Sequence, residues 1–279
     1  LMRVADWIAD YLWSIGVSRV HGLMGGGAAT LNDGFIKHQG IEYICYHHEQ
    51  GAGHAAIGEA KYTGKLAVVN PTTGCGGTNC ATSVLNAWQD GVPVLFLSGN
   101  VRRDTCTAYI NKKSEINLRH YGLQEHDISA TYENMTKISM FVHDAEDVKH
   151  ILQMAVAFAL TGRPGPVWVD IPIDVQSAEM LEDSAGYDDY DYDFPPVSKS
   201  LPALLYAAAR PVVLAGMGIR QSGTVDQFVK FVNKYQLPFV TSYGAQDYLP
   251  YDHPLNMGTI GSRGTRFGNF AMQNADLLL

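Results

Sequence analysis

The chain has 279 residues, of which 46% are hydrophobic, so it is long enough to bury a sizeable core in one or two domains. Its formal net charge is -8, and no block of lysine and arginine interleaved with aromatic residues occurs, so nucleic-acid binding is not expected. No apolar run approaches the ~20 residues of a membrane span, and the four cysteines form no C-x-x-C pair. We therefore expect a cytoplasmic protein with free thiols and no membrane contact.

Short β-branched runs alternate with longer helical patterns along the first part of the chain. The predicted strands, each bounded by turn residues, are 41–46, 66–69, 92–98 and 167–171. The predicted helices are 4–15, 28–36, 52–62, 79–89 and 144–160. Strands that alternate with helices in this way predict an α/β fold in which a parallel sheet is flanked by helices on both faces.

A change in composition at 177–203 predicts a linker between two domains. This segment is acidic, rich in tyrosine and contains three prolines. A second strand–helix–strand pattern follows and predicts a partial Rossmann-like α/β domain over 204–279, with its elements at 212–215, 224–235 and 239–241. The final residues, 276–279, have the pattern of a buried strand that is just beginning. We therefore expect a piece of a longer protein, or a chain that a second chain completes.

The stretch with the most chemistry-bearing side chains, HHEQGAGHAA at 47–56, follows a predicted strand and begins a helix. Glu49 is thus expected where α/β folds place ligands, at the carboxyl end of a strand. Three hypotheses remain open from the residues alone. The first is a metal site, although the spacing is not H-E-x-x-H, with ligands His47, His48, Glu49 and His54. The second is a solvated acid at a helix start, and the third is a carboxylate in a mostly apolar cleft that exchanges a proton with a heterocycle.

Six segments, in the order of the chain, resemble enzymes of the acetolactate synthase type, which use thiamine diphosphate. They are VHGLMGGG at 20–27, HEQGAGHAAIGEA at 48–60, TGCGGTN at 73–79, DGVP at 90–93, LQEHD at 123–127 and TGRPGPVWVDIP at 161–172. Each segment alone is a weak signal, but six in the family's order are specific. Two positions depart from the family: Cys75 stands where proline is usual, and Arg263 stands where flavin-binding synthases tend to carry histidine.

The resemblance implies that residues 1–176 are a pyrimidine-binding domain in which Glu49 activates the cofactor. Family enzymes use such a carboxylate to hydrogen-bond a ring nitrogen of the cofactor's pyrimidine. Gly25 and Gly26 would bring backbone close to the reacting groups, and Gln124 would direct its amide at substrate or cofactor. The other residues expected to line the cofactor pocket are His48, Thr73, Gly74, Gly76 and Asn79.

Plainer alternatives remain open at three of these places. Gly25 and Gly26 also fit an ordinary tight turn before a helix. Asn79, or Thr78 beside it, is also a residue type that caps a helix start. Gln124 is also typical of an exposed loop.

The resemblance further implies a reaction. The family decarboxylates a 2-oxo acid such as pyruvate and transfers the two-carbon unit to an acceptor carbonyl. Alternatives are a different reaction with the same cofactor, such as cyclic dione hydrolysis or a sugar-pathway ligation, and a non-catalytic dimerising module. Flavin (FAD) binding by the second domain is left open by Arg263.

The resemblance also implies what must come from elsewhere. Family enzymes hold the diphosphate and Mg²⁺ in a further domain with a G-D-G element, and their sites form between two subunits. That element is not found in the 279 residues, and no loop offers carboxylates at a spacing suited to Mg²⁺, so no metal ligand is predicted. We expect a homo-oligomer (dimer or tetramer) or a completing second chain, and little or no activity from residues 1–279 alone.

Overall fold

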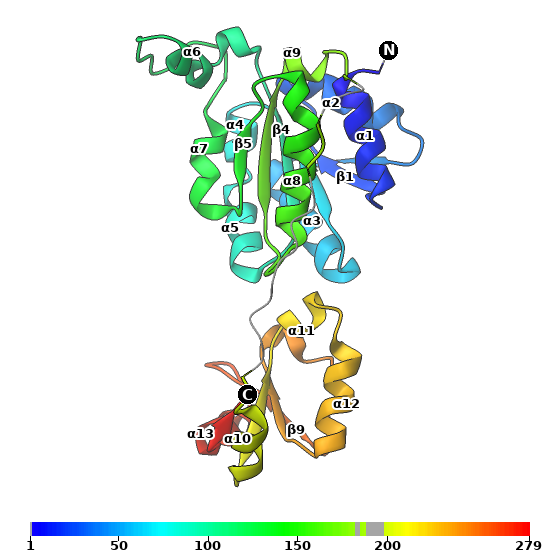
Figure 1. Cartoon of the computed structure of the whole chain (residues 1–279), viewed down its shortest axis with the longest axis vertical. Coiled ribbons are helices and arrows are strands. Elements are labelled where there is room, and N and C mark those ends of the chain that lie inside the picture. Colours follow the sequence, from blue (N-terminus) through cyan, green and yellow to red (C-terminus); the bar gives the residue numbers. More distant parts are fainter. Residues whose placement is uncertain (1, 182–184, 188–197) are drawn as a thin grey trace. The chain divides into compact units, whose positions relative to one another are not determined.

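The structure is a computed structural model that describes residues 2–181, 185–187 and 198–279 (Figure 1). The chain divides into two compact units, residues 1–192 and 193–279, and each is considered by itself. Much of the predicted linker 177–203 lies outside the described residues. The predicted domain bounds therefore stay predictions.

The first unit is built on a six-stranded sheet with the order β2-β1-β3-β4-β6-β5, and every strand pair in it is parallel. Its strands are β1 (Arg19–Gly22), β2 (Glu42–Cys45), β3 (Ala67–Asn70), β4 (Val94–Asn100), β5 (Ser139–Phe141) and β6 (Val167–Pro172). The three strands β3, β4 and β6 are buried along their whole length. Such continuous burial is typical of parallel strands covered on both faces.

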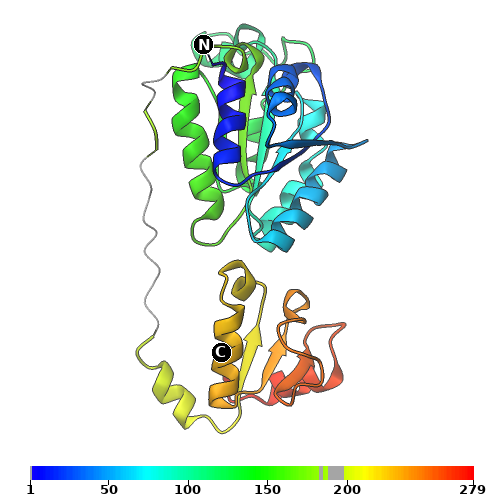
Figure 2. The ribbon, with the colours of Figure 1, turned by 90° about the vertical axis from the view of Figure 1, so that its right-hand side faces the viewer.

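Helices cover both faces of this sheet (Figure 2). The longer ones are α1 (Val4–Ser14), α2 (Ala29–Lys37), α3 (Glu49–Thr63), α5 (Ala81–Asp90), α6 (Thr107–Lys113), α7 (Ile128–Tyr132) and α8 (Val148–Leu160). Single turns are η1 (Gly26–Ala28), α4 (Cys75–Thr78), η2 (Arg103–Thr105), η3 (Glu133–Met135), η4 (Ala145–Asp147) and α9 (Ile173–Gln176). The predicted α/β fold with a parallel sheet is confirmed.

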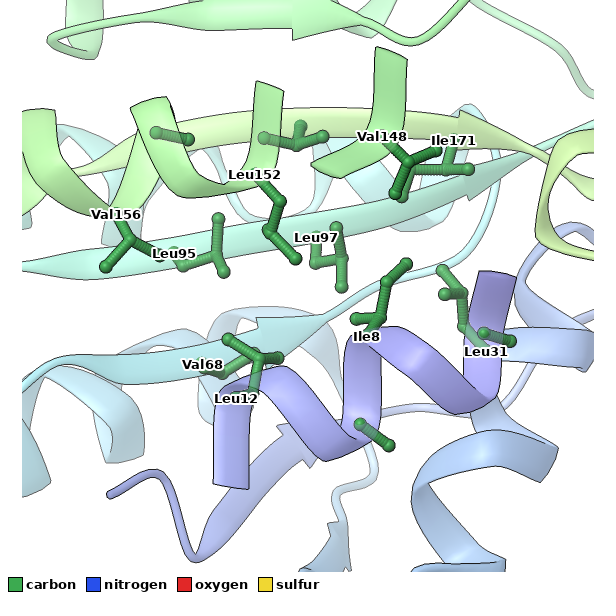
Figure 3. Packing of buried hydrophobic residues seen from close by; sticks show 14 of the residues in the cluster. Ile8, Leu12, Leu31, Val68, Leu95, Leu97, Val148, Leu152, Val156 and Ile171 are labelled. Atoms are coloured by element: carbon green, nitrogen blue, oxygen red, sulfur yellow. The ribbon is translucent and has the colours of Figure 1, made fainter. Parts of the chain in front are cut away.

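Alternation along β4 divides the core into two layers. Leu95 and Leu97 pack with α1, α2 and α8, in the cluster that contains Ile8 and Leu152 (Figure 3). Phe96 faces the opposite layer, which α3 and α5 cover. This two-residue period is the geometry of a strand, and it buries apolar side chains on both faces of the sheet.

The segment 20–27 is not a glycine turn throughout, as its resemblance suggested. Val20, His21 and Gly22 belong to β1 and pair with both β2 and β3, so the turn itself begins only after Gly22. Val20 is completely buried, and burial between two strands favours a strand there despite the glycines that follow.

The second unit has a four-stranded parallel sheet with the order β10-β7-β8-β9. Its strands are β7 (Pro211–Ala215), β8 (Phe239–Thr241), β9 (Asn256–Thr259) and β10 (Leu277–Leu278). Its helices are α10 (Leu201–Ala207), α11 (Gly218–Gln221), α12 (Val225–Tyr235), η5 (Tyr243–Ala245) and α13 (Arg266–Asn274). The strand predicted at 276–279 is present as β10, which pairs with β7.

In neither unit do the described residues include a helix long and apolar enough to cross a membrane.

Candidate functional site

The segments predicted to form the site follow neighbouring strands of the first unit. The turn with Gly25 follows β1, the helix that begins at Glu49 follows β2, and the turn at 73–79 follows β3. Because β1, β2 and β3 are parallel neighbours, their carboxyl ends meet at one edge of the sheet. The fold therefore brings the three segments together.

Glu49 is the first residue of α3, and its side chain is buried at 5% exposure. Its Oε2 accepts a hydrogen bond of 2.9 Å from Nδ2 of Asn79. The amino terminus of a helix carries a partial positive charge, which favours a carboxylate at this position. The hypothesis of a solvated helix-start acid is therefore wrong.

The histidines around Glu49 do not converge with it. His47, His48 and His54 are exposed, whereas Glu49 is buried. His48 is the N-cap residue of α3, and its Nδ1 accepts a hydrogen bond of 3.1 Å from the backbone N–H of Gln50. Its predicted contact with a cofactor stays a prediction. Across residues 2–181, 185–187 and 198–279, no group of three His, Cys, Asp or Glu side chains is placed to hold a metal ion.

Thr72 lies where the two glycine turns meet, beside Glu49. A Cβ added to Gly25 would lie 2.5 Å from Cβ of Thr72, so only glycine permits this approach. A Cβ added to Gly76 would lie 2.7 Å from Cγ2 of Thr72 and 3.0 Å from Oε1 of Glu49. The hydroxyls of Thr72 and Thr73 are buried without a hydrogen-bond partner in the structure. Two unpaired buried hydroxyls in the turn that follows β3 are suited to a polar ligand, because leaving them unpaired is costly.

Gly74 and Gln124 are in direct contact, although 50 residues separate them. Gly74 has φ +50° and ψ −104°, and a Cβ there would collide with the carbonyl oxygen of Gln124. Gln124 itself has φ +61°, which is unusual for a residue other than glycine. The loop that carries Gln124 thus packs onto the turn that carries Asn79, while the Gln124 side chain remains exposed.

Replacing Gly74 by Ala is expected to destabilise the first unit by about 3 kcal/mol, because backbone strain and a steric clash add. A matched control is Gly64→Ala, since Gly64 also has positive φ (+70°) but open space around its Cβ position. That control should lose only about 1 kcal/mol, the cost of the left-handed conformation. Urea denaturation of both variants checks this, and equal losses would show that the contact with Gln124 is not tight.

The helix-cap alternative for Thr78 and Asn79 is wrong. The N-cap position of α5 belongs to Cys80, and no side chain caps that helix. Thr78 instead donates its hydroxyl to the carbonyl of Cys75 at 3.1 Å. Gly26 begins the single turn η1, and a Cβ added there would lie in open space. Its surroundings therefore fit the alternative of an ordinary tight turn.

Buried aromatic and polar side chains support the turn at 73–79. Tyr132 donates its hydroxyl to the carbonyl of Gly77 at 2.7 Å, and its ring stacks on Trp168 with centroids 4.3 Å apart. Trp168 donates its indole N–H to Ser98 at 2.8 Å, and Ser98 donates to Asp170 at 2.5 Å. Burial raises the pKa of Asp170 to about 7.

All four cysteines are free, as predicted, and they differ in their surroundings. Cys45 and Cys75 are exposed, and Cys75 lies in the turn beside Gly74. Cys80 is buried under the site, where burial and then the nearby Glu49 carboxylate raise the pKa of its thiol. Cys80 is therefore a neutral packing group.

The match to known families covers both units. Residues 2–131 match the family model described as "Thiamine pyrophosphate enzyme, N-terminal TPP binding domain", and residues 199–279 match "Thiamine pyrophosphate enzyme, central domain". The chain belongs to the thiamine pyrophosphate (thiamine diphosphate) enzymes. This agrees with the family that the six sequence segments resemble.

Several relatives share one name. The chain is 34% identical over 278 residues to the acetolactate synthase large subunit of Lactococcus lactis, covering 98% of this chain and 46% of that protein. It is 32% identical over 280 residues to acetolactate synthase isozyme 2 large subunit of Escherichia coli, covering 100% and 49%. It is 31% identical over 287 residues to a probable acetolactate synthase large subunit of Methanocaldococcus jannaschii, covering 100% and 46%. The chain thus spans about half the length of these curated relatives.

Proposed function

We propose that this chain is the amino-terminal portion of a thiamine-diphosphate-dependent carboligase. The complete enzyme would decarboxylate a 2-oxo acid such as pyruvate and transfer the two-carbon unit to an acceptor carbonyl, as the name of its relatives suggests. The observation that carries the proposal is the buried carboxylate of Glu49, which Asn79 holds beside Gly76. A dimerising scaffold has no need of a buried, oriented carboxylate in a glycine-lined site.

The residues present fit the pyrimidine side of the cofactor. Glu49 would hydrogen-bond a pyrimidine ring nitrogen, and the Asn79 amide keeps its carboxylate oriented. The unpaired hydroxyls of Thr72 and Thr73 are available to polar groups of a ligand. The cofactor, when bound, would supply a ring carbon that can add to the substrate carbonyl once it has lost its proton, and a ring that takes up the electron pair released by decarboxylation.

Other parts of the proposal concern groups outside this chain. The diphosphate and Mg²⁺ would be bound by residues that the chain does not contain, in a homo-oligomer or together with a second chain.

Flavin binding by the second unit stays a prediction. Arg263 is exposed after β9, and the visible absorption spectrum of the purified protein would show whether flavin is bound. A cytoplasmic location also stays a prediction.

The test of function uses the complete protein that contains these residues. With thiamine diphosphate, Mg²⁺ and pyruvate, we expect release of CO₂ and formation of acetolactate. Consumption of a cyclic dione without CO₂ release would favour the alternative reaction with the same cofactor. No turnover of any of these substrates, together with no binding of thiamine diphosphate, would favour the non-catalytic module.

Residues 1–279 alone are expected to be catalytically silent with pyruvate, thiamine diphosphate and Mg²⁺. The reason is that Glu49 and its neighbours offer hydrogen bonds to a pyrimidine but no cluster of acids for Mg²⁺ among the described residues. The measurement is CO₂ release by the purified 279-residue chain, with the complete protein as control. Turnover by the short chain at a rate comparable with the complete protein would overturn this prediction.

A further inference from the structure

Glu125 is a buried carboxylate beside Gln124 that the sequence analysis did not assign to the site. It is 6% exposed, and three donors from the same stretch of chain surround it. Thr107 donates its hydroxyl to Oε1 and its backbone N–H to Oε2, the latter at 3.2 Å. The backbone N–H of Tyr121 lies 3.4 Å from Oε1. Within the described residues no cation pairs with this acid, so hydrogen bonds alone compensate its burial.

The three donors lie at the two ends of the segment 107–121, an excursion of the chain that leaves the body of the first unit and returns to it. Thr107 begins α6, which projects from the body of the first unit in Figure 1, and Tyr121 ends the loop that returns from it. Inside the excursion, Asn111 and Leu118 exchange two hydrogen bonds of 2.8 Å. Glu125 therefore closes the base of the excursion 107–121.

The backbone of Gln124 needs neighbouring residues to hold it in its conformation. Its φ of +61° is unfavourable for a residue with a side chain, and a conformation of this kind persists only where the surroundings impose it. The Gln124 side chain is exposed and so does not impose it. The neighbours that do are Glu125, which is fixed by Thr107, and the turn at Gly74, on which the Gln124 carbonyl packs.

We propose that Glu125, held by Thr107 and Tyr121, is a positioning residue that fixes Gln124 at the rim of the site so that its amide meets the substrate. This inference rests on the proposed function, in which Gln124 acts on substrate or cofactor. A carboxylate suits this role better than an amide, because two of its three partners are backbone N–H groups, which only donate, and they face different oxygens of the carboxylate. Whichever way its amide is turned, Glu125→Gln would point its –NH₂ group at one of these N–H groups and open the base of the excursion.

The experiment uses four variants of the complete protein. Glu125→Gln and Thr107→Val remove the anchor, and Thr107→Ser keeps the hydroxyl. The matched control is Thr136→Val, because Thr136 is a buried threonine whose hydroxyl donates to the Tyr132 carbonyl at 2.8 Å, away from Gln124. Two experiments are carried out: steady-state kinetics, which give kcat and KM for the 2-oxo acid, and tryptic cleavage of the cofactor-free protein, which gives the rate of cutting after Lys112, Lys113 and Arg119.

We expect Glu125→Gln and Thr107→Val to lower kcat/KM by roughly 10–100-fold, since small misplacements of a site residue cost rates of that order. Tryptic cleavage in the excursion should accelerate at least about fivefold in the same variants, because local opening exposes the cleavage sites. Thr107→Ser should stay within about threefold of the original protein on both measures, and Thr136→Val should change neither.

A double-variant comparison isolates the role of Gln124. In a Gln124→Ala background, adding Glu125→Gln should lower kcat/KM by less than about threefold, because residues that act through one another are not additive. Equal losses in both backgrounds would overturn the positioning role, as would loss of activity in Thr136→Val as large as in Glu125→Gln. Failure of the proposed function would give a different result: either the original protein would not turn over the 2-oxo acid, or Glu49→Gln would turn it over at the rate of the original protein.

Discussion

Replacing Glu49 by Gln in the complete protein is expected to lower turnover by about 10²–10⁴-fold, the usual contribution of a positioned proton-transfer group. Glutamine has the same shape, and its carbonyl oxygen can keep the hydrogen bond from Asn79 that holds this side chain at 2.9 Å. It has no proton-exchanging carboxylate, however. The fold should therefore survive while cofactor activation is lost.

The measurement that separates activation from later steps is the exchange of the cofactor's reactive ring proton for deuterium in the bound state. Glu59→Gln is the matched control, since it makes the same change on the same helix. Glu59 contacts His21 at 2.6 Å and lies outside the glycine-lined site. Exchange that slows equally in both variants, or in neither, would remove Glu49 from its proposed role.

The fold could be predicted because its strands carry their own signal. The run at 92–98 is apolar except for Ser98, and most of it lies in β4 at the centre of the sheet. The strands β5 and β9 escaped prediction, because they have only three and four residues and no fully buried pattern. Such short strands form because a neighbouring strand supplies hydrogen bonds, and that information is not local.

The same distinction applies to the site. Glu49 could be predicted because its position after a strand and before a glycine-rich helix is visible in the sequence. Thr72 could not, because what makes it notable is the meeting of Gly25 and Gly76 around it, and these belong to different turns. The sequence shows Glu125 only as part of the segment 123–127, because the groups that donate hydrogen bonds to its carboxylate lie 18 and 4 residues earlier in the chain. Residues defined by their neighbours in space need the fold before they can be recognised.

The stability of the first unit is expected to fall as the pH rises from about 4 to 7, because of Asp170. Burial raises the pKa of this carboxyl to about 7, and the hydrogen bonds from Ser98 (2.5 Å) and Asn100 (2.6 Å) only partly oppose that effect. In the unfolded chain an aspartate has a pKa of about 3.9. Between these values the folded state retains a proton that the unfolded state has released, so raising the pH favours unfolding.

The size of this effect follows from the shift of about three pKa units, which corresponds to roughly 4 kcal/mol of unfolding free energy. The extra stability is complete below pH 4 and lost above pH 7. Asp170→Asn cannot ionise, and the Ser98 hydroxyl can reverse to accept from its amide, so this variant should lose most of the pH slope while remaining folded.

Urea unfolding of residues 1–279 between pH 4 and 8 measures this slope. All four tryptophans lie in the first unit, at positions 7, 13, 88 and 168, so their fluorescence reports that unit alone. Asp147→Asn is the control, because Asp147 is an exposed aspartate of the same unit. If Asp170→Asn kept the slope of the original chain, the buried carboxyl would have to be ionised already at pH 4, and Ser98 and Asn100 would then outweigh the cost of its burial.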